Sequence, residues 1–234
     1  MKYAIEVSGL SKNYEKIQAL KKISLKIKEN ECFGLFGPNG AGKSTVISIL
    51  TTLIPPTSGN AKISGFDLAK EKQKIKSIIS AAFQEPTLDD ELTGIENLEL
   101  YAALKNSKNS FEDILDLIEL NERIDDLVKT YSYGMKRRLE IGRCLSVDAK
   151  IIFLDEPTRS LDADIRKKIL KHLLNAKKNA TIFIATHSVH EAKFLCDRIG
   201  IMDKGNLIKI CDAKNLEKNV NEILGKTFEE DYFD

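Results

Sequence analysis

The hydrophobic pattern of this chain alternates between short apolar runs and stretches with helical periodicity. Five runs are almost continuously apolar, as expected for strands that are buried on both faces of a parallel sheet. They are residues 32–36, 78–83, 151–154, 181–185 and 199–202. Because helical patterns lie between these runs, the sequence predicts an α/β fold in which helices connect the strands of a mostly parallel sheet.

The N-terminal part follows a different pattern, with apolar and polar residues in alternation at 4–7 and 23–27. Such alternation indicates strands with one exposed face, which is typical of antiparallel sheets. A third candidate strand, 61–63, follows the turn signal Pro-Pro-Thr-Ser-Gly at 55–59. We therefore predict an antiparallel β subdomain near the N-terminus.

The region from about 94 to 147 carries only helical patterns. Four of its apolar residues have the i, i+3, i+4, i+7 spacing of one buried helix face, namely Phe111, Ile114, Leu115 and Ile118. A loop is predicted at 106–110, with Ser110 as the N-cap of the helix that follows. Because this block interrupts the α/β pattern, we expect an inserted helical subdomain at about 86–147, inside a single domain that spans residues 1–234.

Composition narrows the choice of partners and compartment. The chain has 42% hydrophobic and 30% charged residues and a net charge of +1, so no strong field favours nucleic acid or acidic lipid. The four cysteines show neither disulfide nor metal-site spacing, which suits a reducing compartment. No signal-peptide or membrane-spanning pattern is visible. We expect a cytoplasmic protein that does not insert into the membrane itself, with an acidic, mobile ending at 229–234.

Residues 37–45 match the phosphate-binding pattern G-x-x-x-x-G-K-[ST], between an apolar run and a helical run. Backbone N–H groups of such a loop surround phosphate oxygens, and the helix N-terminus adds positive potential. Lys43 is expected to reach the β- and γ-phosphates, and the Ser44 hydroxyl to bind Mg²⁺. The predicted nucleotide-binding residues of the loop are Gly37, Pro38, Asn39, Gly40, Ala41, Gly42, Lys43, Ser44 and Thr45.

An acidic pair, Asp155 and Glu156, follows the apolar run 151–154. Carboxylates at the end of a buried strand face the carboxyl edge of the sheet, where α/β proteins bind their ligands. Asp155 is therefore a candidate Mg²⁺ ligand, and Glu156 a candidate general base for the attacking water. Acidic pairs also occur in ordinary loops and helix starts, but the phosphate loop in the same chain favours the catalytic interpretation.

Taken together, six motifs in a fixed order resemble those of the ATP-binding-cassette ATPases, over about residues 3–212. The motifs are 37–45, 83–85, 131–138, 154–158, 160–162 and 185–187. The resemblance implies a P-loop NTPase core that binds and hydrolyses ATP with Mg²⁺. It also implies that Tyr14 stacks on adenine, that Gln84 contacts Mg²⁺ and the attacking water, and that His187 contacts the γ-phosphate.

The resemblance further implies a dimer of two copies with shared ATP sites. Asp162 would bridge the copies, while Ser132 and Gly134 would cap the γ-phosphate of ATP bound by the opposite copy. Plainer interpretations stay open for single residues: Tyr14 as an ordinary half-buried aromatic, Gln84 and Ser132 as turn or cap residues, His187 as structural. Arg137 and Arg138 are interpreted as part of a solvated basic face.

The signature motif departs from the usual L-S-G-G-Q of the family, since residues 131–135 read Y-S-Y-G-M. Tyr133 replaces a glycine, so its backbone must adopt a conformation that is open to a side chain. Met135 cannot donate the hydrogen bond that a glutamine can. Such substitutions are similar to those of the subfamily that includes antibiotic-resistance, sodium-efflux and polysaccharide exporters.

The function that the resemblance implies is that of the ATP-hydrolysing subunit of an exporter. It would work as a homodimer at the cytoplasmic face of the membrane, attached through a separate integral membrane permease. Residues 86–92 are a candidate docking surface for this permease, or simply a loop between strand and helix.

The sequence disfavours two other functions. A cassette ATPase that acts on nucleic acid or ribosomes is disfavoured, because the chain holds one cassette and no sustained heptads between Lys43 and Ser132. A regulator that binds ATP without hydrolysing it is disfavoured by the intact Lys43, Asp155, Glu156 and His187.

Overall fold

The computed structural model describes residues 2–224 and contains a central six-stranded sheet in the order β10-β9-β3-β8-β7-β6. The strands are β3 (Cys32–Phe36), β6 (Ile79–Ala82), β7 (Ile151–Asp155), β8 (Thr181–Thr186), β9 (Arg198–Asp203) and β10 (Asn206–Asp212). All neighbours pair in parallel except β10, which runs antiparallel to β9. The predicted α/β fold with a mostly parallel sheet is confirmed, and the five predicted strands agree with the observed ones to within one residue at each end.

A second sheet of four antiparallel strands lies beside the first, in the order β2-β1-β4-β5. Its strands are β1 (Tyr3–Tyr14), β2 (Ile17–Lys28), β4 (Ser58–Ile63) and β5 (Phe66–Asp67). β1 and β2 extend beyond the predicted strands, because register shifts in their pairing break the simple alternation on which the prediction rested. Helix α1 (Lys43–Leu50) contacts both sheets, so the phosphate loop begins inside a shared hydrophobic core.

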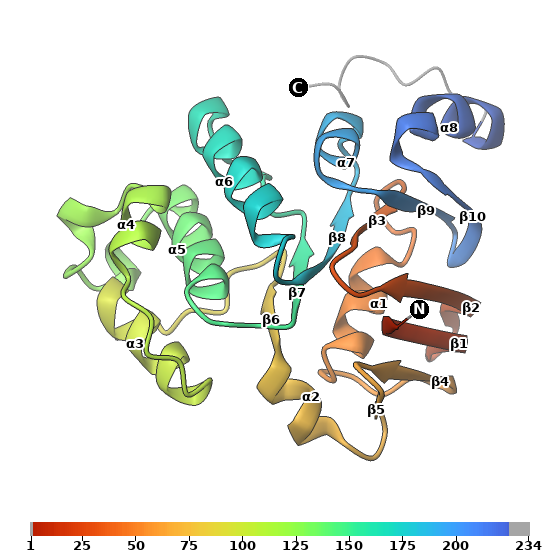
Figure 1. The fold of residues 1–234 in the computed structure, drawn as a ribbon, viewed down its shortest axis with the longest axis horizontal. Helices are drawn as coiled ribbons and strands as arrows, with labels where there is room; N and C mark the ends of the chain where they lie inside the picture. Colours follow the sequence, from red (N-terminus) through yellow and green to blue (C-terminus); the bar gives the residue numbers. More distant parts are fainter. Residues whose placement is uncertain (1, 225–234) are drawn as a thin grey trace.

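The opposite face of the six-stranded sheet is covered by α6 (Ala163–Ala176), α7 (Val189–Leu195) and α8 (Leu216–Leu224), which lie together above it in Figure 1. The short helix α2 (Lys72–Ile78) leads into β6, and a 3₁₀ turn (Ala213–Asn215) leads into α8. None of the helices within residues 2–224 is long and apolar enough to cross a membrane. The predicted acidic ending at 229–234 lies outside the described residues.

The helical block consists of α3 (Gly94–Leu104), α4 (Glu112–Ile118) and α5 (Tyr133–Leu145), with 3₁₀ turns at Asn121–Arg123 and Val128–Thr130. Figure 1 shows it at one end of the molecule, away from the antiparallel sheet. The block has a core of its own, made of Leu98, Ile114, Ile118, Leu120, Ile124, Val128, Tyr131 and Leu139.

The prediction that Ser110 is the N-cap of α4 is wrong. The cap is Phe111, whose ring packs against the core of the helical block, and the helix begins one residue later than predicted. The Ser110 hydroxyl still accepts a hydrogen bond from the backbone N–H of Glu112 at 3.3 Å.

Candidate active site

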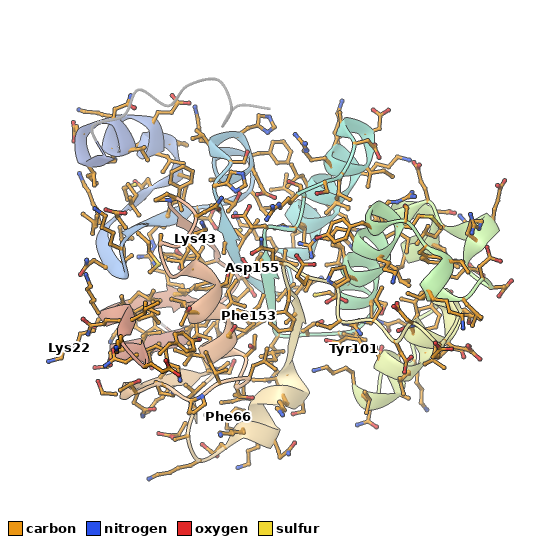
Figure 2. The ribbon with its side chains drawn as sticks, turned by 180° about the vertical axis from the view of Figure 1, so that it is seen from behind. Lys22, Lys43, Phe66, Tyr101, Phe153 and Asp155 are labelled. Atoms are coloured by element: carbon orange, nitrogen blue, oxygen red, sulfur yellow. The ribbon has the colours of Figure 1, made fainter. Side chains whose placement is uncertain are left out.

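A cavity of about 680 Å³ opens where the phosphate loop follows β3. Its wall includes most of the phosphate loop, Gln84 from the segment after β6, and Glu156 from the segment after β7. The carboxyl ends of parallel strands meet at one edge of a sheet, so this is the edge at which α/β proteins bind ligands. Figure 2 shows Lys43 and Asp155 in the middle of the molecule, between the helical block and the antiparallel sheet.

The phosphate loop holds its shape through two glycines and one lysine. Gly42 has φ of 101°, a conformation that side chains rarely adopt. A Cβ atom on Gly37 would lie 2.2 Å from the carbonyl oxygen of Met202, so no side chain fits there. The Lys43 ammonium donates to the carbonyls of Gly37 at 2.7 Å and Pro38 at 3.2 Å, which keeps it inside the curve of the loop.

Glu156 lies between two other candidate catalytic residues. Its Oε1 atom is 3.7 Å from Nζ of Lys43, and its Oε2 atom is 2.6 Å from Nδ1 of His187. Lys43 and His187 follow β3 and β8, and Glu156 follows β7. Because β8 pairs in parallel with both β3 and β7, the three strands end together and bring the three side chains into contact.

Asp155 has the surroundings of a cation ligand. Its carboxylate is 3% exposed, and Oδ1 is buried without a hydrogen-bond partner among the described residues, as an atom reserved for another ligand would be. Burial raises the pKa of Asp155, while a hydrogen bond from Ser44 and the charge of Lys43 lower it. Burial lowers the pKa of Lys43, against the attraction of Glu156 and Asp155. These residues fit a phosphate group together with a divalent cation.

The remaining candidates lie outside the wall of this cavity as the structure describes it. Ser132 is exposed and caps α5, with its hydroxyl accepting from the N–H of Met135 at 3.2 Å, and Gly134 lies in the first turn of that helix. Asp162 caps α6 by accepting from the N–H of Ile165 at 2.9 Å.

Tyr14 also lies outside the cavity wall and is 44% exposed, with the ammonium of Lys12 5.1 Å from its ring centroid. Its partner across the β1–β2 hairpin, Ile17, does line the cavity. Sequence reasoning missed Ile17 and six other lining residues, namely Gln18, Ala19, Lys21, Arg159, Lys204 and Gly205. Only the three-dimensional packing brings the hairpin and the turn after β9 to the phosphate loop.

The interpretation of Arg137 as part of a solvated basic face is wrong. Its side chain is 1% exposed and donates four hydrogen bonds to backbone carbonyls, whereas Arg138 is partly exposed and donates to the carbonyls of Ile118 and Glu119. The two residues differ because Arg137 lies on the face of α5 that packs against the sheet. There, carbonyl oxygens at the strand ends accept hydrogen bonds from its guanidinium.

Another buried acid, Glu191 in α7, lies behind the candidate active site. It is fully buried beside Glu156, and burial raises its pKa from the ordinary value of 4.5 to about 7, although hydrogen bonds with Thr186 and Thr158 oppose this rise. Its burial could not be predicted from the sequence, since a glutamate in an amphipathic helix normally faces solvent.

The raised pKa of Glu191 predicts a pH-dependent stability difference between wild type and Glu191→Gln. Below pH 4.5 the Glu191 carboxyl is protonated in both the folded and the unfolded state. Between pH 4.5 and about 7 it is protonated only in the folded state, so the free energy of unfolding decreases as pH rises. The glutamine variant does not titrate and lacks this loss. The difference between its free energy of unfolding and that of wild type should therefore increase by up to about 1.4 kcal/mol per pH unit in this range. Urea unfolding at pH 5, 6, 7 and 8 measures it, and a pH-independent difference would contradict the assignment.

Comparison with known proteins agrees with this architecture. A family model described as ABC transporter matches residues 20–159. The chain is 36% identical over 226 residues to an uncharacterized ABC transporter ATP-binding protein, YhcH, of Bacillus subtilis (strain 168), covering 95% of this chain and 73% of that protein. It is 38% identical over 212 residues to the linearmycin resistance ATP-binding protein LnrL of the same strain, covering 88% and 68%.

The fold is also that of a solved cassette. A structure described as the dimeric post-hydrolysis state of the ATP-binding cassette MJ0796 bound to ADP and Pi is similar with a TM-score of 0.82 and 30% identity, covering 89% of this chain and 98% of that one. Motif order, strand topology and the phosphate cradle lead to the same conclusion: the chain belongs to the ATP-binding proteins of ABC transporters.

Proposed function

We propose that this transport ATPase works as a head-to-tail dimer that closes around Mg²⁺-ATP and drives export through a separate membrane permease. One copy would supply the phosphate loop and the acidic pair, and the other its exposed Ser132 and Gly134 at the start of α5. The observation that carries the proposal is the position of Glu156, in contact with both Lys43 and His187.

The chemistry follows from what each group can do at its position. Glu156 can accept the proton of an attacking water, a role worth about 10²–10⁴-fold in rate. His187, 2.6 Å from Oε2 of Glu156, would orient this carboxylate, and Lys43 would hold the β- and γ-phosphates. Gln84, on the cavity wall, would orient the water. Mg²⁺, held by Asp155, Ser44 and Gln84, would neutralise charge that develops on the phosphate oxygens.

The dimer is supported by the location of the signature residues. Ser132 is exposed and is the N-cap of α5, and the N-terminus of a helix favours an anion through its backbone N–H groups and dipole. Tyr133, which replaces the usual glycine, is the first residue of α5, and a helical backbone accepts a side chain without strain. The related cassette whose structure holds ADP and Pi is dimeric.

Removal of the divalent cation should abolish hydrolysis. EDTA is expected to stop phosphate release, and excess Mg²⁺ to restore it, because Asp155 holds an unpartnered oxygen for the cation. Asp155→Asn should need at least about tenfold more Mg²⁺ for half-maximal rate. Titration of Mg²⁺ in a phosphate-release assay measures this, with Asp116→Asn on the exposed side of α4 as the control. Equal Mg²⁺ requirements in all three proteins would exclude Asp155 as a ligand.

The permease would dock on residues 86–92, in contact with α3 and α5. This segment is held by buried side chains, since the backbone N–H of Thr87 donates to Glu140 and that of Asp89 to Asn97. Because of these hydrogen bonds, a displacement of residues 86–92 by the permease would be transmitted to Gln84 and to α5. Export is supported by the relative whose name states linearmycin resistance.

Purification from detergent-extracted membranes tests the coupling to a permease. A tagged chain should retain a multi-helix membrane protein that has no cassette of its own, identified by mass spectrometry. Retention of RNA or ribosomes in its place would support the alternative function on nucleic acid. The family matches favour transport over that alternative.

A further inference from the structure

The guanidinium of Arg137 spans the carboxyl ends of two neighbouring strands. Nη1 donates to the carbonyls of Phe83 and Gln84, which follow β6. Nη2 donates at 2.7 Å to the carbonyl of Asp155, at the end of β7, and at 2.7 Å to that of Glu156. Because β6 and β7 pair in parallel, these carbonyls lie side by side, and the planar fork of an arginine reaches both strand ends at once.

Arg137 is buried without a counter-ion. No carboxylate within residues 2–224 lies at ion-pair distance from it, and the nearby buried Glu140 is paired instead with Arg143 at 2.7 Å. Burial lowers the pKa of Arg137, against the attraction of Glu140. Burying a charge without an ion-pair partner is unfavourable, whereas an apolar side chain would pack α5 onto the sheet without burying a charge. Packing alone therefore does not explain an arginine here.

The backbone of Glu156 explains what the arginine does. Glu156 has φ of 50°, in the left-handed region that residues other than glycine rarely adopt, so its backbone is strained. Three hydrogen bonds hold it there: its N–H donates to the carbonyl of Ala185 at 2.9 Å, and its own carbonyl accepts from the N–H of Arg159 at 3.2 Å and from Nη2 of Arg137 at 2.7 Å. Since this backbone conformation sets the direction of the side chain, Arg137 helps to aim the Glu156 carboxylate at His187.

The same helix also holds Gln84. The Gln84 carbonyl accepts from Nη1 of Arg137 at 3.4 Å and from the hydroxyl of Tyr133 at 3.3 Å. Both donors lie in the first turns of α5, whose N-cap is Ser132. One end of α5 therefore contacts the segment of the water-orienting glutamine and the segment of the general base.

We propose that Arg137 is a positioning residue for ATP hydrolysis, which holds the backbones of Gln84 and Glu156 in register with the helix that begins after Ser132. The proposal rests on the proposed role of Glu156 as the base. Arg137 does not line the cavity at the phosphate loop, so its loss should lower kcat and leave nucleotide binding in place.

Three variants test this proposal. Arg137→Met removes the donors, and a small displacement of a base is enough for a loss of about 10²-fold in kcat. Arg137→Lys keeps the charge, but its single ammonium cannot reach both strand ends, so an intermediate kcat is expected. Arg138→Gln, one residue along the same helix, is the matched control and should keep the wild-type kcat. Affinity for a fluorescent ATP analogue and KM should stay within about threefold for all variants.

Wild-type kcat in Arg137→Lys or Arg137→Met would overturn the proposal, and so would an equal loss of kcat in Arg138→Gln. Parallel loss of nucleotide affinity and kcat would assign Arg137 to the nucleotide cavity instead, and would also overturn it. If Arg137→Met does not fold, Arg137→Lys decides alone, provided that its melting temperature matches wild type. Glu156→Gln is measured in parallel: a wild-type rate there would refute the base assignment, whatever the Arg137 variants show.

Discussion

Glu156→Gln should bind ATP as well as the wild-type protein or better, yet hydrolyse it about 10²–10⁴-fold more slowly. The amide has the shape of the carboxylate but cannot accept a proton from water. It also removes a negative charge 3.7 Å from Lys43, at the place where the terminal phosphate is expected, so repulsion of the nucleotide should fall. With binding intact and hydrolysis blocked, the ATP-bound dimer should accumulate.

Two measurements on the same preparation check this result. Phosphate release gives the rate, and size-exclusion chromatography with light scattering gives the mass with ATP and with ADP. The control is Glu119→Gln. Glu119 lies at the end of α4, and its exposed carboxylate forms an ion pair with Lys168. A rate for Glu156→Gln equal to that of the control would remove Glu156 from the role of base. A slow variant that stays monomeric with ATP would leave the base assignment standing and reject the dimer.

Ser132→Asp should prevent ATP-driven dimerisation while each chain still binds ATP. Aspartate caps a helix as well as serine does, so the start of α5 and the fold should be preserved. In the proposed dimer, however, the new carboxylate would face the γ-phosphate bound by the opposite copy. Like charges at such contact cost several kcal/mol when solvent is excluded, so the closed dimer should be undetectable and hydrolysis should fall with it.

The matched control is Ser132→Asn, which keeps the cap and adds no charge. It should dimerise in the Glu156→Gln background, where the wild-type signature is expected to give a stable dimer, whereas Ser132→Asp in that background should not. Light scattering at several protein concentrations separates a weakened dimer from an abolished one. Unchanged dimerisation of the aspartate variant would mean that Ser132 lies far from the phosphates of any partner, and the shared-site proposal would be discarded.

Both predictions depend on α5, which connects the two halves of the proposed mechanism. Its first residues would face the ATP of the opposite copy, while Arg137, little more than one turn later, contacts the carbonyls of Gln84 and Glu156 in its own copy. If α5 moves when the dimer closes, the positions of Glu156 and Gln84 would therefore change with it. Combining Ser132→Asp with Arg137→Lys should show whether the two effects are independent.

The sequence alone determined five of the six strands of the central sheet, all except β10, together with the phosphate loop and the acidic pair. These features are local: a run of apolar residues specifies a buried strand, and the glycines at 37, 40 and 42 allow the turn that the loop requires. Parallel strands that end at one edge then place Lys43 near Asp155 whatever the details of packing.

Only the tertiary structure decided which charged residues are buried and what they contact. Arg137 and Arg138 are adjacent and chemically identical, yet one is 1% exposed and the other partly exposed, because only the first faces carbonyls at the ends of β6 and β7. Glu191, buried behind Glu156, likewise has hydrogen-bond partners on other elements of the fold, namely Thr186 at the end of β8 and Thr158 after β7. The cost of burying a polar group is offset by partners that the fold brings together, and local sequence carries no record of those partners.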